Sequence, residues 1–284
     1  MANRLEIAST VHGNPDAPTV ILIHGVVHQQ HAWDPVVPLL AEKYRVVTFD
    51  LPGHGASGAI PKGTNPIPYV LDSLAEIIEE LGTPGERPHL VGNSLGGYVA
   101  LEMGSRGLAC GVTGISPAGF FRNRFELKHA EQVFLALKKS VGVIKPLVPK
   151  LSANRVSRSV MFGVFSTHPW KYPAESMLID ANALADNTLL DELPDLDFTF
   201  SSPTDRNLPI TIAWGTRDLV LFAGQRHNVH NYFPQARIIP MRGLGHVPMS
   251  DDPERIAQII DTSAARSFAR EKRLGSLRDK NGER

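Results

Sequence analysis

The 284-residue sequence has very little cysteine and no excess of either charge. Its only cysteine, Cys110, excludes an intramolecular disulfide and fits a reducing compartment. We expect Cys110 to be buried and unreactive. The 29 Lys and Arg residues balance the 29 Asp and Glu residues, so no general attraction to nucleic acid or to an anionic membrane is expected.

Long apolar runs are also missing. None approaches the roughly 20 residues that a helix needs to cross a bilayer. Residues 1–18 show neither the apolar core of a secretion signal nor the Arg- and Ser-rich pattern of a transit peptide. Together with the single cysteine, these absences predict a soluble, cytoplasmic protein with no membrane span. They leave its oligomeric state open.

The sequence does contain a regular alternation of short apolar runs and segments with helical spacing. The apolar runs predict strands at 19–25, 45–50, 89–94, 111–116, 208–215 and 236–241. Helical spacing predicts helices at 32–44, 67–82, 95–107 and 252–273. Near-continuous apolar strands separated by helices are typical of a mostly parallel sheet covered on both faces. The predicted fold class is therefore α/β.

The alternation stops near Pro117 and resumes near Leu208, and this gap is too long for a loop in a compact domain. Its sequence has helical spacing, which predicts a helical insertion. We therefore predict a core formed by residues 1–117 and 207–273. The helical insertion covers 118–206, and a flexible tail covers 274–284. Residues 121–160 hold nine Lys or Arg against two acids, and 161–205 hold one Lys against eight acids. Pairing of these halves, or simple solvation, is favoured over an anion-binding surface.

The stretch GNSLG at 92–96 places Ser94 between glycines, after a predicted strand and before a predicted helix. A serine in such a turn has a strained backbone that only small neighbours permit. The start of the following helix also places backbone N–H groups where an oxyanion would develop. We therefore interpret Ser94 as a candidate nucleophile, although the five-residue pattern alone also occurs in ordinary turns.

A serine hydroxyl needs a base, and the base needs a carboxylate to hold its tautomer. Among the eleven histidines, His246 lies in the loop between the last predicted strand and the closing helix, where ligands bind in parallel sheets. Asp218 follows the strand at 208–215 and is the candidate carboxylate. Asp251 and Asp252 follow His246 too closely and look suited to capping the closing helix, with Asp252 as its N-cap.

An oxyanion requires two convergent N–H donors. We expect them from the backbone of Leu95, next to the nucleophile, and of Val26, in the loop after the first predicted strand. His24 is interpreted as a brace of that loop. His28 and His31 could contact substrate or could have structural or solvent-facing roles, and their spacing lacks an obvious carboxylate or cysteine partner for a metal. No cofactor or metal is expected.

These residues resemble the α/β-hydrolase superfamily. The matching blocks follow the order and spacing of that family over residues 22–254: IHG, FDLPGHGAS, GNSLGG, WGTRD and GHVPMSDDPE. The resemblance implies an eight-stranded type of sheet, and a cap over the active site that enters after the sixth strand. It implies a triad of Ser94, Asp218 and His246, and a structural turn at Asp50 and His54. A serine nucleophile disfavours the dehalogenase and epoxide-hydrolase branches.

The expected function is a serine hydrolase that cleaves an ester-like bond in a small, largely apolar molecule through an acyl-enzyme. The cap would roof the pocket with side chains such as those at 160–165, although such a run is more often core. The basic first half of the cap leaves room for a carboxylate or phosphate on the substrate. The alternatives are a carbon–carbon bond hydrolase of a dienoate, a slow-turnover ligand-binding member of the fold, and acyl transfer to an acceptor other than water.

Overall fold

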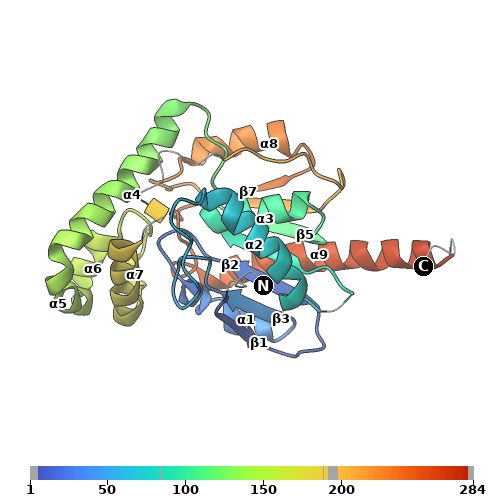
Figure 1. The fold of residues 1–284 in the computed structure, drawn as a ribbon, viewed down its shortest axis with the longest axis horizontal. Coiled ribbons are helices and arrows are strands. Elements are labelled where there is room, and N and C mark those ends of the chain that lie inside the picture. The colour runs from blue at the N-terminus through green and yellow to red at the C-terminus, as the bar shows by residue number, and fades with distance from the viewer. Residues whose placement is uncertain (1–5, 84, 188, 191–197, 281–284) are drawn as a thin grey trace.

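A mostly parallel β-sheet forms the centre of the molecule (Figure 1). The computed structural model describes residues 6–83, 85–187, 189–190 and 198–280. In this part of the chain the sheet has seven strands in the order β1-β3-β2-β4-β5-β6-β7, and β1 alone is antiparallel to its neighbour. The strands are β1 Ser9–His12, β2 Thr19–Ile23, β3 Arg45–Phe49, β4 His89–Asn93, β5 Gly111–Ile115, β6 Ile210–Gly215 and β7 Arg237–Met241.

The predicted α/β class and parallel sheet are confirmed, with two differences in the strands. The described residues form seven strands rather than the eight that the resemblance implied. Strand β1 was not predicted, because it lies at the margin of the sheet with largely exposed side chains and one apolar residue, Val11. Such a strand pairs through its backbone and carries no apolar signal in its sequence.

Two pairs of helices flank the sheet (Figure 1). Helix α2 (Pro66–Leu81) packs with α3 (Leu95–Ser105), and α1 (Val37–Ala41) packs with the long closing helix α9 (Pro253–Lys280). A further short helix, α8 (Val229–Tyr232), follows β6. The sheet is therefore shielded from water by helices that come from both halves of the chain.

Two predicted helices have different bounds in the structure. The helix predicted at 32–44 is a 3₁₀ turn at Gln30–Trp33 followed by the short α1, because Pro35 and Pro38 cannot donate backbone hydrogen bonds. The closing helix continues to Lys280 rather than ending at 273. Gly275 costs a helix only about 1 kcal/mol, and its neighbours are good helix formers. Residues 281–284 of the predicted tail lie outside the described residues.

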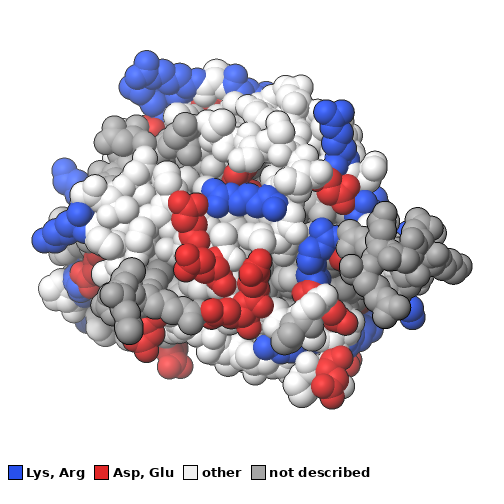
Figure 2. Space-filling view, turned by 45° about the vertical axis from the view of Figure 1, so that its right-hand side comes forward, with Lys and Arg blue, Asp and Glu red and all other residues white. Residues whose placement is uncertain are grey.

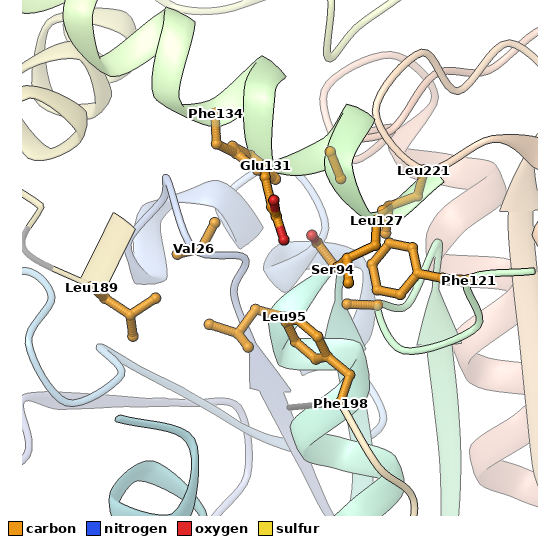
Figure 3. Close-up of a pocket in the computed structure, with 12 residues that line it drawn as sticks. Val26, Ser94, Leu95, Phe121, Leu127, Glu131, Phe134, Leu189, Phe198 and Leu221 are labelled. Atoms are coloured by element: carbon orange, nitrogen blue, oxygen red, sulfur yellow. The ribbon is translucent and has the colours of Figure 1, made fainter. Parts of the chain in front are cut away.

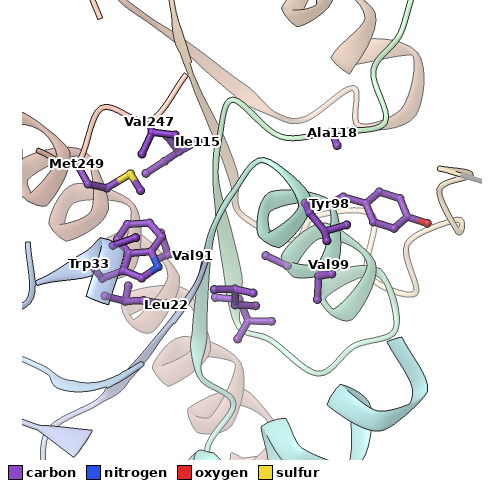
Figure 4. Close-up of a cluster of buried hydrophobic side chains, with 14 of the residues drawn as sticks. Leu22, Trp33, Val91, Tyr98, Val99, Ile115, Ala118, Val247 and Met249 are labelled. Carbon is purple, nitrogen blue, oxygen red and sulfur yellow. The ribbon is translucent and has the colours of Figure 1, made fainter. Parts of the chain in front are cut away.

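The apolar core surrounds the central strands. Figure 4 shows Leu22, Val91 and Ile115 from β2, β4 and β5, with Val99 of α3 on one side and Trp33 on the other. All five side chains are fully buried. A core packed this densely holds the carboxyl ends of the strands in fixed positions, and the loops that leave those ends carry the candidate site residues.

Among the described residues, four α-helices lie between β5 and β6 and form a separate group beside the sheet, at the left of Figure 1. They are α4 (Arg124–Ile144), α5 (Val148–Ala153), α6 (Arg155–Phe162) and α7 (Ala174–Asp186). This group, which we call the cap, falls inside the insertion predicted at 118–206, of which residues 188 and 191–197 are not described. Lys145 pairs with Asp186 at 2.7 Å, so the basic and acidic halves of the cap contact each other.

One anchor of the cap is Asp251, in the loop after β7. Its carboxylate is buried and accepts hydrogen bonds from the Thr167 backbone and hydroxyl, both at 2.9 Å, from the His168 backbone at 3.1 Å and from the Ser166 hydroxyl. The expectation that Asp251 caps α9 is wrong. Asp252 alone does so, accepting from the Arg255 backbone at 3.2 Å.

A second anchor joins α7 to the loop after β2. The Asp180 carboxylate lies 3.1 Å from His31 Nε2 and 3.7 Å from His28 Nε2, and it accepts a hydrogen bond from the Tyr172 hydroxyl. Burial lowers the pKa of His28 to about 4 despite the charge of Asp180. Burial also opposes protonation of His31, but the hydrogen bond and charge of Asp180 outweigh it and raise the pKa of His31 above its ordinary value.

The Asp251 anchor predicts a stability difference between two adjacent aspartates. Asp251→Ala leaves several partly buried donors without an acceptor, and we expect it to lower the free energy of unfolding by about 3 kcal/mol. Asp252→Ala removes one helix-capping bond, and we expect a loss of about 1 kcal/mol. Denaturant unfolding measures both values, and equal losses would contradict the anchoring role of Asp251.

The His31–Asp180 pair predicts a dependence of stability on pH. Because the folded state raises the pKa of His31, its contribution is fully present below the unfolded pKa near 6.5 and is lost as pH rises through the folded value. We therefore expect the unfolding free energy of the wild type to exceed that of His31→Asn by less at pH 9 than at pH 6. His227→Asn, the matched change at an exposed histidine, is the control, and a His31 difference that grew with pH would refute the assignment.

Candidate active site

The turn at Ser94 connects β4 directly to α3. Ser94 has a φ of 54° and a ψ of −117°, a region that residues with a side chain rarely occupy. The turn requires small neighbours. A Cβ on Gly92 would lie 2.0 Å from the Gly96 carbonyl oxygen, and a Cβ on Gly96 would lie 2.3 Å from that of Ile23. The two glycines of the sequence motif are therefore sterically required.

The strained conformation of Ser94 is held by the next strand. Its N–H donates to Ile115 O at 3.1 Å, and its carbonyl oxygen accepts from Ala118 N at 3.0 Å and from Tyr98 N at 3.1 Å. These bonds join the turn to the end of β5 and to the first turn of α3. The serine is thus presented at the carboxyl edge of the sheet by surrounding backbone.

His246 and Asp218 meet in the loops that follow β7 and β6. His246 Nδ1 lies 2.8 Å from Asp218 Oδ2, and both side chains are buried. The other oxygen, Asp218 Oδ1, accepts from Val220 N at 2.9 Å and Leu221 N at 2.8 Å. The carboxylate is therefore held in one orientation and favours the tautomer in which Nδ1–H donates a hydrogen bond to it, so that Nε2 is the nitrogen left to act as an acceptor.

The free nitrogen of His246 faces the same small cavity as Ser94. Nε2 is buried and has no hydrogen-bond partner among the described residues. Ser94 and His246 line this cavity together with Val26 and His28. Asn93 steadies the histidine loop, since its Nδ2 donates to His246 O at 3.0 Å. An unpartnered imidazole nitrogen in a shared cavity is suited to accept a proton from a hydroxyl.

The two predicted oxyanion donors lie beside Ser94. Val26 and Leu95 both line a larger pocket with it (Figure 3). Within the described chain, neither backbone N–H donates to a backbone acceptor. Two side chains fix the Val26 backbone, because Asn187 Nδ2 of the cap donates to Val26 O at 2.6 Å and His54 Nε2 lies 2.8 Å from the same oxygen.

Three further polar residues brace the loops around the site. His24 Nε2 accepts from Leu51 N at 2.9 Å. The pKa of His24 is well below its ordinary value, mainly because the ring is buried and also because His54 lies nearby. The His24 ring therefore stays neutral. Asp50 accepts from Gln30 N at 2.8 Å and Ala56 N at 3.1 Å. These contacts agree with the structural roles expected for His24, Asp50 and His54.

Of the three interpretations left open for His28 and His31, the solvent-facing one does not hold for His28, which is 1% exposed. It lies edge-on to Phe162 and Phe165 of the cap. The fold also supplies the carboxylate partner that the sequence spacing lacked, Asp180. Among the described residues, no group of three or more His, Cys, Asp or Glu side chains is arranged to hold a metal ion.

The larger pocket above Ser94 is almost entirely apolar. Figure 3 shows Val26, Leu95 and Leu189 on one side of the serine, and Phe121, Leu127 and Leu221 on the other. Helix α4 forms the roof with residues spaced three and four apart. This spacing was visible in the sequence, but it did not indicate which face of α4 would meet the core.

The segment 160–165 roofs the site only in part. Val160 is 80% exposed and points away from the core. Phe165 is buried and lines the small cavity beside His246. Sequence reasoning missed Glu131 of α4, which is the one acidic side chain among the described residues that line the larger pocket. It also missed Asp180 and Asn187, whose contacts depend on how the cap docks.

No helix in the described chain is long and apolar enough to cross a bilayer. Figure 2 shows acidic side chains in the middle of one face with Lys and Arg around them, so both charges share that face. This mixture accords with the zero net charge.

Known proteins resemble this chain in sequence and in fold. An uncharacterized protein of Mycobacterium tuberculosis is 25% identical over 89% of this chain and 79% of its own length. A bacterial membrane phospholipase A superposes with a TM-score of 0.73 at 22% identity, covering 94% of this chain and 84% of the other. A meta-cleavage product hydrolase of Pseudomonas fluorescens superposes with a TM-score of 0.67 at 18% identity, covering 91% and 94%.

Identities this low in the two solved structures establish a shared fold and no shared substrate. The family is established separately, by a sequence model. Residues 20–259 match the model of the alpha/beta hydrolase family, and the match includes the Ser94 turn and the loops of Asp218 and His246. Because it spans most of the chain, this protein belongs to the alpha/beta hydrolase family.

Proposed function

We propose that this protein is a serine hydrolase that cleaves an ester-like bond in a small, largely apolar substrate. One observation carries the proposal: His246 is fixed through Nδ1 by Asp218, while its Nε2 is buried and unpartnered in a cavity that Ser94 also lines. This is the arrangement that a serine nucleophile and its base require. Membership of a hydrolase family supports it.

In the proposed reaction, His246 Nε2 takes the Ser94 hydroxyl proton as Oγ attacks the substrate carbonyl carbon. The carbonyl oxygen becomes an oxyanion that the N–H groups of Leu95 and Val26 bind. The intermediate collapses, the bond to the alcohol oxygen breaks, and His246 donates its proton to that oxygen. Water, deprotonated by His246, then attacks the acyl-enzyme and releases the acid and free Ser94. Asp218 stabilises the imidazolium in both steps.

The pocket supports a mainly apolar substrate. Aliphatic and aromatic side chains from the core and the cap surround Ser94, with Phe121 and Phe134 among the largest. Burying acyl or alkyl groups against them is favourable by about 25 cal/mol per Å².

A cytoplasmic location remains part of the proposal. Cys110 is buried, and burial raises the pKa of its thiol to about 12, which leaves the thiol unreactive.

Carbon–carbon bond hydrolysis is the second candidate, favoured by the superposition with a meta-cleavage product hydrolase. Its dienoate substrates would bring a carboxylate into the pocket. Glu131 lies there, and no Lys or Arg is among the described residues that line it. Like charges at short range disfavour such a complex, so we rank ester hydrolysis first.

The proposed nucleophile is tested with a p-nitrophenyl ester of a short fatty acid. Ser94→Ala should lower kcat by about 10⁴-fold, because the reaction loses its attacking oxygen, and Asp218→Asn should lower it nearly as far by presenting the wrong tautomer of His246. Ser105→Ala, at another buried serine of α3, is the control and should keep wild-type activity. Retention of most activity in Ser94→Ala would refute the mechanism.

The ranking of the two reactions predicts how the enzyme treats a charged dienoate. We expect kcat/KM for simple esters to exceed that for dienoate cleavage by about 100-fold or more, because Glu131 repels the substrate carboxylate. Product analysis by chromatography separates ester hydrolysis from carbon–carbon cleavage. The methyl ester of the dienoate is the uncharged control. Faster cleavage of the free dienoate than of any ester would reverse the ranking.

A further inference from the structure

The carboxylate of Glu131 projects from α4 toward the Ser94 hydroxyl (Figure 3). It enters a pocket whose other described lining residues, apart from Ser94, are apolar. An acidic side chain in this position is unexpected, since removing a charge from water without a partner is unfavourable. The mechanism proposed above assigns it no role.

Three other acidic side chains of the cap have partners. Glu126 pairs with Arg122, Asp180 with His31 and Asp186 with Lys145. In contrast, Glu131 makes no ion pair or hydrogen bond within the part of the chain that the structure describes, and its side chain is half-buried. The carboxylate therefore contributes nothing visible to holding the cap together.

The basic residues of the cap do not supply this partner. Lys138 Nζ donates to Asn187 O at 2.8 Å, Lys145 pairs with Asp186, and Arg158 donates to Ser152 O at 2.6 Å. None of the three lines the pocket. The expectation that the basic half of the cap leaves room for a substrate carboxylate or phosphate is therefore not supported by the pocket, because the only charged side chain among its described lining residues is acidic.

We propose that Glu131 is a specificity residue that selects esters carrying a protonated amine a few atoms from the scissile carbonyl, and that it rejects esters carrying a carboxylate. The inference rests on the proposed function and deepens it, because it names the substrate class. The half-buried carboxylate lies among the apolar side chains of Val26, Phe134 and Leu189, and apolar surroundings strengthen its interaction with a cation compared with water. Ser94 and Glu131 then bind the two ends of one substrate.

The test compares esters that differ in charge and match in shape. On the alcohol side they are the butyrates of 2-(dimethylamino)ethanol, 3-methylbutanol and 3-hydroxypropanoate. On the acyl side they are the ethyl esters of 4-(dimethylamino)butanoate, 5-methylhexanoate and glutarate. At pH 7 the members of each set are cationic, neutral and anionic. The measured quantity is kcat/KM, from the rate of acid release.

In at least one of the two ester sets, the wild type should have a kcat/KM about 10-fold or more higher for the cationic ester than for its neutral match. This factor corresponds to the usual contribution of a charge-assisted hydrogen bond. The anionic ester should be the poorest of its set. Glu131→Gln keeps the shape and removes the charge, so the cationic-to-neutral ratio should fall toward one. Glu175→Gln makes the same change at an exposed glutamate of α7 and should keep the wild-type ratio.

A wild type that hydrolyses all three charges equally on both sides would overturn the inference while leaving the ester hydrolase intact. So would a Glu131→Gln variant that slows all esters equally, because that result assigns the carboxylate a role independent of substrate charge. If no ester of any charge is hydrolysed, Ser94 can be labelled with two p-nitrophenyl phosphonates, one with a dimethylaminoethyl arm and one with a 3-methylbutyl arm. Mass spectrometry measures both labelling rates, and their ratio replaces the cationic-to-neutral ratio of kcat/KM. Absence of both hydrolysis and labelling would instead refute the proposed function itself.

Discussion

The left-handed backbone of Ser94 is the constraint on which the site depends. It exists only because Gly92 and Gly96 leave room for neighbouring carbonyl groups and because Ile115 and Ala118 hold the Ser94 backbone from both sides. This conformation directs the side chain away from the sheet and starts α3 immediately afterwards. The proposed oxyanion donor at the start of α3 and the cavity shared with His246 follow from the same turn.

The cap and the site are mechanically connected, because the cap contacts the loops that carry the site. Asp251 binds the cap five residues after His246, Asp180 contacts His28, and Asn187 holds the backbone of Val26. A shift of the cap would therefore disturb the proposed base and the expected oxyanion donor together. The same docking brings α4 over Ser94, so the residues that shape the pocket and those that carry the proposed chemistry share one set of contacts.

Local patterns made much of this protein predictable. The Ser94 turn is a contiguous motif, and the loops of Asp218 and His246 directly follow apolar strands, so their convergence at one edge of the sheet follows from parallel topology. Prediction failed where a contact is made at long range. Strand β1 has no apolar pattern, and Asp251 binds the cap rather than the helix that follows it, α9. Helix α4 has a clear apolar periodicity, but this periodicity does not indicate which part of the protein each face of the helix contacts.

The sequence by itself determined the α/β class, the insertion between β5 and β6, and the identity of Ser94, Asp218 and His246 as candidates, since each depends on residue type and spacing along the chain. Only the tertiary structure decided that His28 is buried against the cap, that Asp180 is its partner, and that the carboxylate of Glu131 faces Ser94. The physical reason is that docking of the cap depends on shape and burial over surfaces distant in sequence, which periodicity cannot encode.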